Sequence, residues 1–242
     1  MQRAYQMWTQ FMSFVKTVPV VIAIILGCFF PAIAFAHNIA GGDADFVTSN
    51  AGAAVGPFIY LGAKHMVTGY DHLLFLAGVV FFLNRPMQVV QYVSLFALGH
   101  SLTLLTGVLA NISVNAYLID AIIALSVVYK ALENMGALQS LGRWRPDTRW
   151  AVFVFGLFHG LGLSASLQEL NLNPDGLLIN LISFYVGVEL GQLTALSMIV
   201  LGFALWRRHP GFNRMAFTSN TKLMCAGFTL MIYQLTAWWL NA

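Results

Sequence analysis

Imidazole and carboxylate side chains occur inside stretches that are otherwise apolar enough to lie in lipid. They are Asp71, His72, His100, His159 and Glu189. An ionisable group costs roughly 2.5–3.5 kcal/mol at the bilayer centre on insertion scales, so such groups persist mainly where they have a function. Nitrogen and oxygen donors together suit borderline divalent metals. The sequence therefore predicts an intramembrane site for a transition-metal ion or for protons.

A further histidine extends this set along the chain. His65, Thr68, Gly69 and His72 are spaced i, i+3, i+4, i+7, so they share one face if their helix is continuous. Asp71 lies beside this stripe. The alternative for any single histidine is an ordinary hydrogen bond to a neighbouring helix, but several histidines at converging depths favour a shared site.

Depth in the membrane follows from the helical rise of about 1.5 Å per residue. The ionisable residues are expected to be graded from the outer surface to the midplane. In that order they are His65, then Asp71 and His72, then His100 and Glu189, then His159. This gradation predicts a track of metal ligands that opens to the outside.

A second polar group is expected nearer the inner surface. Lys130 and Glu133 are three residues apart and can pair within one helix. They act either as a structural ion pair, with Lys130 extending toward water, or as an inner gate or proton-coupling pair. Tyr185 and Gln192 share a helical face with Glu189 and are assigned to the same gating or proton-coupling group.

Composition places the chain in the class of membrane proteins. Of its 242 residues, 59% are hydrophobic and 9% are charged, whereas a soluble domain carries about 25% charged residues. The net charge of +3 comes mostly from loops between apolar segments, so no nucleic-acid partner is indicated. Two cysteines, Cys28 and Cys225, offer neither a disulfide framework nor a CxxC site. No nucleotide-binding P-loop is present.

The N-terminal region is expected to be a cleaved signal peptide. Arg3 and Lys16 belong to a basic leader, Val18–Phe30 is an apolar run of signal-peptide length, and Ala34-Phe35-Ala36 is a small-residue cleavage site. An uncleaved first transmembrane helix is the alternative. Cleavage would make His37 the first residue, where its amine and imidazole could chelate a metal together. Otherwise His37 is an ordinary residue of a polar tail.

The predicted fold is all-α: a polytopic membrane protein with a six-helix transmembrane bundle. Residues 1–36 are the signal peptide, residues 37–57 an extracytoplasmic N-terminal segment, and residues 58–242 the transmembrane domain. The six spans are expected at Phe58–Leu83, Gln88–Ala110, Ala116–Leu138, Trp150–Leu167, Leu177–Trp206 and Leu223–Leu240. The first is longer than needed, and its Phe58–Thr68 part is alternatively a separate interfacial or re-entrant helix.

Basic residues occur in alternate loops. One set of loops carries Arg85, Arg143, Arg145, Arg149, Arg207, Arg208, Arg214 and Lys222, whereas residues 111–115 and 168–176 contain no lysine or arginine. The positive-inside rule puts the basic loops in the cytoplasm. Both mature termini are then extracytoplasmic.

Small residues recur at helix-packing intervals. Gly156-x-x-x-Gly160 and Gly187-x-x-x-Gly191 allow close helix approach, and chance in a glycine-rich chain is the alternative. Gly69-x-x-His72 and Gly156-x-x-His159 would lie in helices of opposite direction, as in an inverted three-plus-three repeat.

Five motifs, each on a different predicted helix, resemble the HupE/UreJ family of bacterial membrane proteins. They are Gly69-Tyr-Asp-His-Leu-Leu-Phe-Leu76, Leu98-Gly-His-Ser-Leu-Thr103, Ala124-Leu-Ser-Val-Val-Tyr129 with Glu133-Asn134, Gly156-Leu-Phe-His-Gly-Leu-Gly162 and Gly187-Val-Glu-Leu-Gly-Gln192. The resemblance spans about Gly56 to the C-terminus. It implies an association with nickel hydrogenase and urease systems and a role as a nickel or cobalt permease in the bacterial inner (cytoplasmic) membrane.

The resemblance also implies site residues. His65, Asp71, His72, His100, His159 and Glu189 match the family's positions. The better-known members have an H-P-x-x-G-x-D-H element, where this chain has Met66 in place of proline, and it matches a less characterised branch more closely.

The favoured function is a passive or proton-coupled uptake permease for Ni²⁺, with Co²⁺, Zn²⁺ or copper as other candidate ions. The alternatives are a membrane-embedded metal-dependent hydrolase, with Asp71 or Glu189 as base or with Ser164 as nucleophile, and a non-transporting metal-binding assembly or chaperone protein. The expected partners are the lipid bilayer and the metal ion, with a homo-oligomer or a metalloenzyme-maturation protein as further candidates.

Overall fold

The computed structural model describes residues 52–83, 85–169 and 175–241, with the side chain of residue 169 excepted. These residues belong to one compact unit, Ile39–Ala242. All regular structure in them is helical. The predicted signal peptide, His37 and most of the N-terminal segment lie outside the described residues.

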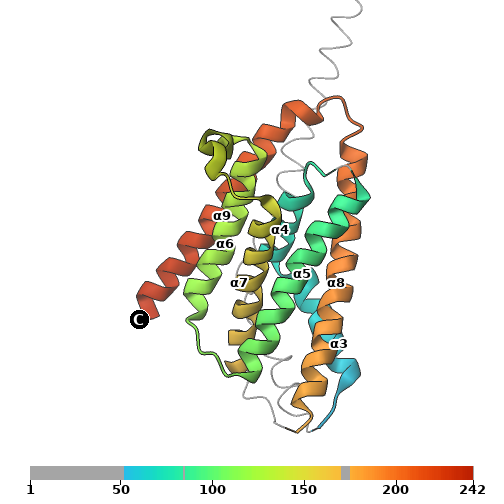
Figure 1. The fold of residues 1–242 in the computed structure, drawn as a ribbon, viewed down its shortest axis with the longest axis vertical. Coiled ribbons are helices and arrows are strands. Elements are labelled where there is room, and N and C mark those ends of the chain that lie inside the picture. Colours follow the sequence, from blue (N-terminus) through green and yellow to red (C-terminus); the bar gives the residue numbers. More distant parts are fainter. Residues whose placement is uncertain (1–51, 84, 170–174, 242) are drawn as a thin grey trace, which may run out of the picture. The chain divides into compact units, whose positions relative to one another are not determined.

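Seven α-helices and one 3₁₀ helix make up this part of the chain (Figure 1). Their bounds are α3 Val55–Thr68, α4 Tyr70–Val80, α5 Pro86–Leu109, α6 Ala116–Asn134, η2 Ala137–Trp144, α7 Thr148–Glu169, α8 Leu177–Trp206 and α9 Phe212–Asn241. Pro86 begins α5, where its missing N–H costs no hydrogen bond. Asn115 caps α6 by accepting a hydrogen bond from Leu118 N–H at 3.1 Å.

Four of the six predicted spans are confirmed as helices long and apolar enough to cross a membrane: α5, α7, α8 and α9. Of the other two predicted spans, the third corresponds to α6, which contains three charged residues, Asp120, Lys130 and Glu133, within its 19 residues and is not among these four. The last predicted span, α9, is longer than expected: it begins at Phe212 and not at Leu223. The apolar pattern begins late because the first turns of this helix are polar.

The first predicted span is not one continuous helix. Gly69 interrupts it with extended backbone angles (φ −73°, ψ 106°) and separates α3 from α4. At about 1.5 Å per residue, the 14 residues of α3 and the 11 of α4 are each too short to cross a hydrocarbon core of about 30 Å alone. The expected continuous face from His65 to His72 is therefore wrong, and the alternative of a separate first helix is correct.

Glycine contacts join the helices in close pairs. A Cβ on Gly160 would meet the His100 carbonyl oxygen, so α7 lies directly against α5. A Cβ on Gly187 would meet the Ile59 carbonyl oxygen, so α8 lies directly against α3. Both predicted small-residue motifs are thus confirmed as packing faces. The third close pair is α6 with α9, where Gly227 faces Val128.

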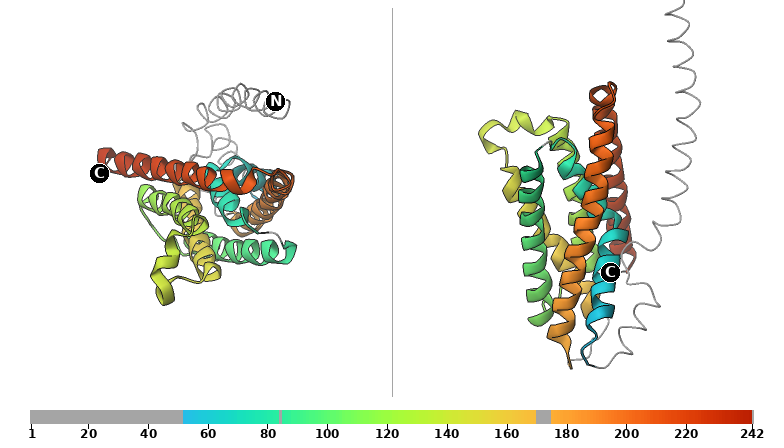
Figure 2. Two further views of the ribbon diagram at one scale, coloured as in Figure 1. Left: turned by 90° about the horizontal axis from the view of Figure 1, so that it is seen from above. Right: turned by 90° about the vertical axis from the view of Figure 1, so that its right-hand side faces the viewer.

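The helix pairs have defined directions. Ile59 and Ala63 face Gly187 and Gly191 in the same order, so α3 and α8 are parallel, as are α5 and α7; α6 and α9 are antiparallel (Figures 1 and 2). The first half of the bundle consists of α3–α4, α5 and α6, and these correspond in order to α7, α8 and α9 of the second half. Exchanging the two halves converts the α3–α8 pair into the α7–α5 pair and leaves the α6–α9 pair unchanged. This is the pairing that an inverted three-plus-three repeat requires.

The loops that carry the arginines gather at one end of the bundle, drawn uppermost in Figure 1. Arg207, just after α8, donates hydrogen bonds to the carbonyls of Val80, Phe81 and Leu83 at the end of α4. Arg145 reaches Glu133 at the end of α6 with N–O 3.3 Å. This end is called the arginine end below.

Candidate intramembrane histidine site

Four imidazole rings from three parts of the bundle meet at the break between α3 and α4. The ring centroid of His72 lies 5.2 Å from that of His65, 5.8 Å from that of His100 and 4.9 Å from that of His159. His72, on α4, is therefore the centre of the group, with α5 and α7 supplying the other two buried rings. We call His65, Asp71, His72, His100 and His159 the histidine cluster.

The helix break gives the cluster its local charge pattern. Asp71 lies in the first turn of α4, where the partial positive charge of a helix N-terminus stabilises a carboxylate. His65 lies in the last turn of α3, whose carbonyl end carries partial negative charge. Discontinuous helices place such ends beside ions in membrane transporters.

Asp71 orients the central ring. Its Oδ1 lies 2.9 Å from His72 Nδ1, and both side chains are buried. A carboxylate accepts here, so Nδ1–H donates and Nε2 of the neutral ring keeps its lone pair. The Nε2 atom is buried and has no hydrogen-bond partner among the described residues. A histidine held by a carboxylate in this way is the usual arrangement of a metal ligand.

His159 is oriented by its own helix. Its Nδ1 lies 2.7 Å from the Phe155 carbonyl oxygen, which can only accept, so Nδ1–H donates. Nε2 is then the lone-pair nitrogen of the neutral ring, as in His72. Two of the four rings thus present the same nitrogen in the ligating form.

His100 and His65 complete the group with different exposure. His100 is 1% exposed, and its Nε2 has no hydrogen-bond partner within the described part of the chain. Its ionisable neighbours there are His72, His159, His65 and Asp71. His65 is only partly buried, so it is the member of the cluster closest to the surrounding medium.

The described side chains do not form a finished coordination shell. Within the described ranges, no three His, Cys, Asp or Glu residues are arranged so that they could hold one metal ion. The rings neighbour one another edge to face, with interplanar angles of 73–80° between His72 and the other three. Joint coordination would require ring rotations.

Glycine lets the backbone approach the cluster closely. A Cβ on Gly69 would lie 3.0 Å from His72 Nδ1 and 3.2 Å from Asp71 Oδ1, the two atoms of the carboxylate–imidazole bond. On α7, a Cβ on Gly160 would also meet Thr103 Oγ1. Thr103 donates to the Leu157 carbonyl at 2.7 Å and ties α5 to α7 beside the rings.

Three predicted site residues, Tyr185, Glu189 and Gln192, lie on α8. Glu189 is not among the ionisable neighbours of His100; it is half-buried, and its carboxyl interacts with the Tyr185 hydroxyl one turn earlier. Gln192 is buried, and its amide donates to the Val93 carbonyl on α5 at 3.4 Å. The structure therefore brings five of the predicted metal-site residues together and has Glu189 interacting with Tyr185 of its own helix, while His37 lies beyond the described residues.

A layer of phenylalanines, which the sequence analysis missed, lies against the histidines. Phe75, Phe96 and Phe155 each lie about one helical turn from His72, His100 and His159, and each is displaced toward the arginine end. Ring centroids in the layer are 5.3 Å apart for Phe75–Phe96 and 5.8 Å for Phe75–Phe155. The repeated histidine-to-phenylalanine offset is the sequence signal that could have found it.

A small polar pocket lies nearer the arginine end. It has a volume of about 230 Å³ and is lined by residues that include Tyr92, Lys130, Glu133, Arg145 and Thr148. Lys130 Nζ lies 2.6 Å from Glu133 Oε2, which confirms the predicted pairing. Thr148 and Arg145 both donate to Glu133 Oε1. Lys130 is 6% exposed, so its side chain does not extend freely into water, although the alternative of a purely structural ion pair at the inner surface predicts that it does.

Ser164, the candidate nucleophile of the serine alternative, lies at the contact between α5 and α7. Ser164 is fully buried; its hydroxyl donates to the Leu161 carbonyl at 3.1 Å and lies against Gly107 of α5. His159, the nearest histidine in sequence, uses Nδ1 on Phe155. Ser164 therefore serves helix packing.

Comparison with known proteins identifies one related family. The model of a family described as HupE / UreJ protein matches residues 42–242. No curated protein and no solved structure matches the chain.

Proposed function

Because the chain belongs to the HupE/UreJ family, we propose that it is an uptake permease for a divalent transition-metal ion, with Ni²⁺ the first candidate and Co²⁺ the second. Family membership and the apolar helices make it a membrane protein related to metal transport. The identity of the ion, the direction of transport and the mechanism are the proposal. The histidine cluster is the observation that carries it.

The donor set suits such an ion. Imidazole nitrogens with one carboxylate bind nickel, cobalt and zinc, whereas thiolates select Cu(I). The described cysteine, Cys225, is exposed on α9 and is not part of the cluster. Asp71 supplies the negative charge near the rings.

The unfinished coordination geometry fits transport better than storage. A permeation site must bind an ion well enough to admit it and weakly enough to release it. Rings that turn to ligate in succession meet both requirements. His65 would receive the ion first, because it is the least buried ring, and His72 would pass it to His100 and His159.

The phenylalanine layer closes the path on its far side. Phe75 and Phe96 are fully buried, and an apolar constriction stops hydrated ions by excluding water. Beyond it, Tyr129 packs on Phe155 with ring centroids 5.3 Å apart and is next in sequence to Lys130 of the polar pocket. The proposed path is thus a histidine layer, an aromatic barrier and an inner polar pocket, in which Lys130 and Glu133 form the inner gate. Flux with and without a pH gradient distinguishes passive from proton-coupled transport.

The test is metal-resolved flux into proteoliposomes with and without a pH gradient. Wild-type protein should transport Ni²⁺ or Co²⁺ in preference to Mg²⁺. His72→Ala should lower uptake at least about tenfold, because loss of one ligand or its support typically costs 10–100-fold in metal affinity. His209→Ala is the matched control, because His209 lies in an exposed turn at the arginine end and should leave uptake unchanged.

The results separate the three candidate functions. Stoichiometric metal binding without flux would favour an assembly or chaperone protein, and metal-dependent turnover of a lipid or peptide would favour a hydrolase. Equal uptake by wild type and His72→Ala would refute transport through the cluster.

A further inference from the structure

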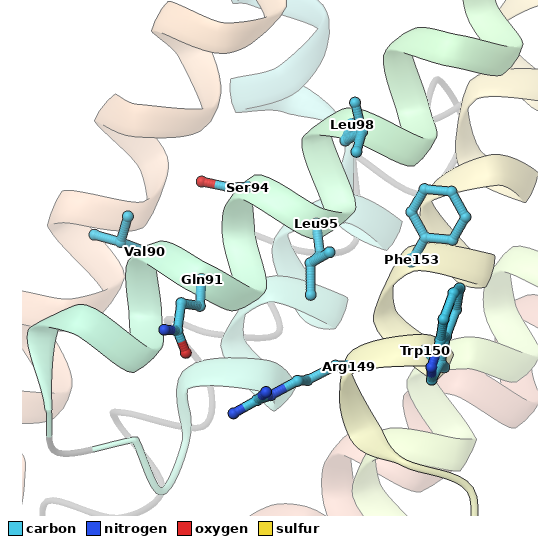
Figure 3. A pocket seen from close by; sticks show the side chains of 8 residues that line it. All are labelled: Val90, Gln91, Ser94, Leu95, Leu98, Arg149, Trp150 and Phe153. Carbon is cyan, nitrogen blue, oxygen red and sulfur yellow. The ribbon is translucent and has the colours of Figure 1, made fainter.

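A groove runs along the outer side of the α5–α7 pair, away from the histidine cluster. It has a volume of about 700 Å³ and opens between the first halves of the two helices (Figure 3). Val90, Leu95 and Leu98 of α5 form one wall, and Trp150 and Phe153 of α7 form the other. From Val90 to Leu98 the apolar wall is about 12 Å long at 1.5 Å per residue.

The positively charged side chain of Arg149 lies at the end of this apolar groove. Arg149 is exposed, and its guanidinium extends from α7 toward the side of the groove formed by Gln91 (Figure 3). It makes no ion pair within the described residues. Asp147, two residues earlier in the sequence, accepts a hydrogen bond from the Arg149 backbone N–H at 2.8 Å and caps the start of α7. The guanidinium is therefore available for an anion.

The groove is placed where lipid would be. Val90 is 57% exposed and Leu98 60% exposed, and both helices are long and apolar enough to cross a membrane. Trp150 is 69% exposed next to Arg149, and tryptophan is enriched at the interface between hydrocarbon and headgroups. The apolar wall thus lies at hydrocarbon depth and the guanidinium at headgroup depth.

We propose that this groove binds one anionic phospholipid, with an acyl chain along the α5–α7 wall and the phosphate at Arg149. Basic residues between transmembrane helices at the cytoplasmic surface bind lipid headgroups in this way, and arginine matches phosphate with paired N–H donors. The charge favours a lipid over a second copy of the chain as the occupant. In an isologous membrane dimer through the groove, the two Arg149 side chains would face each other at the same depth, and their like charges would oppose association.

Lipid binding by the purified full chain tests this. Native mass spectrometry in detergent with equal phosphatidylglycerol and phosphatidylcholine should show a preference for phosphatidylglycerol of about fivefold, the ratio that corresponds to about 1 kcal/mol per basic residue. Arg149→Gln should reduce the preference to about one. Arg143→Gln removes the same charge from an exposed position on η2 outside the groove and should keep it.

A second variant tests the apolar wall. Leu98→Trp fills the groove and should reduce retention of both lipids while leaving the melting temperature in lipid-free detergent unchanged. Phosphatidylglycerol should raise the melting temperature of wild type and of Arg143→Gln but not of Arg149→Gln.

Three outcomes would overturn the proposal. They are equal retention of the two lipids by wild type, equal loss of preference in Arg143→Gln and Arg149→Gln, and a dimer that dissociates when Leu98 is replaced. None of these measurements depends on metal flux, so this proposal and the transport proposal can fail separately.

Discussion

At the scale of single residues, the orientation of each imidazole decides what the cluster can do. His72 and His159 both use Nδ1–H on an oxygen acceptor, at 2.9 Å and 2.7 Å. Each neutral ring therefore presents Nε2 as a donor of an electron pair. Burying these rings without such bonds would leave polar atoms unsatisfied in a medium that has no water. The same bonds that make the burial tolerable also prepare the rings for a cation.

Phe96 is the residue at which the aromatic barrier can be tested. Its ring lies 5.0 Å from His159 and 5.3 Å from Phe75. Phe96→Leu keeps an apolar side chain but removes the ring, so we expect a faster leak of divalent ions and weaker discrimination against Mg²⁺ in proteoliposomes.

The control for this variant is Phe217→Leu on α9, where the phenylalanine is 65% exposed. It should not change the leak. A tight barrier in Phe96→Leu vesicles that retain normal protein levels would show that the phenylalanine layer does not limit flux.

At the scale of elements, the break at Gly69 and the glycine faces position the site. Gly69 N–H donates to the His65 carbonyl at 2.9 Å, and Leu73 N–H donates to the Gly69 carbonyl at 3.1 Å, so the backbone turns with these polar groups satisfied. The close approach of α7 to α5 then sets His159 beside His72. Side chains larger than hydrogen at Gly156 or Gly160 would separate the two helices.

Gly187 tests this packing. A Cβ there would collide with the Ile59 backbone carbonyl, which cannot move as a side chain can. We expect Gly187→Ala to destabilise the folded protein by about 1–3 kcal/mol, the usual cost of overpacking. Thermal unfolding in detergent measures it.

Gly202 is the matched control on the same helix, because an added Cβ would meet nothing within 4 Å. Gly202→Ala should be neutral or stabilising, since alanine is better than glycine in a helix interior by about 1 kcal/mol. Equal destabilisation by both variants would mean that α8 does not depend on close contact with α3.

At the scale of the whole described bundle, one arginine ties the end of α8 to the end of α4. Arg207 donates to three backbone carbonyls, of Val80, Phe81 and Leu83. Partial burial lowers the pKa of Arg207 from its ordinary value, because removal from water disfavours the charged form. By accepting hydrogen bonds, the carbonyl oxygens compensate the guanidinium for that loss of hydration, and the guanidinium in turn satisfies carbonyl groups at the end of the short helix α4.

Replacing this arginine should loosen the arginine end. Arg207→Gln keeps some hydrogen-bonding capacity but loses charge and reach, so we expect a loss of about 1–3 kcal/mol, the cost of leaving buried polar groups unsatisfied. Arg208→Gln changes the same charge at an exposed neighbour and should have little effect. Similar melting temperatures for the two variants would show that the tie is not important for stability.

Membrane orientation is also a property of the whole bundle. The arginine loops gather at one end, and the positive-inside rule predicts that this end is cytoplasmic. In a variant whose native cysteines are serine, Ser113→Cys should react with an impermeant thiol reagent added outside. Gln139→Cys on η2 should react only after permeabilisation. The reverse pattern would invert the proposed direction of uptake.

Much of this architecture could be predicted from the sequence because it depends on local properties. Apolar runs of span length predict α5, α7, α8 and α9, and small residues at four-residue intervals predict the faces of α7 and α8. The spacing of Lys130 and Glu133 predicts their ion pair. The cost of ionisable groups in lipid marks the histidines and Asp71 before any fold is known.

The tertiary structure decided which of these residues meet. Glu189 satisfies the same sequence criteria as His159, yet its carboxyl interacts with Tyr185 of its own helix, and it is not among the ionisable neighbours of His100. The phenylalanine layer and the Arg207 tie join segments far apart in the sequence. The physical reason is that a helix surrounded by lipid is apolar on nearly every face, so its pattern does not fix its rotation. Only packing against other helices selects the face that turns inward, and the four imidazoles share one site because the glycine contacts and the break at Gly69 set those rotations.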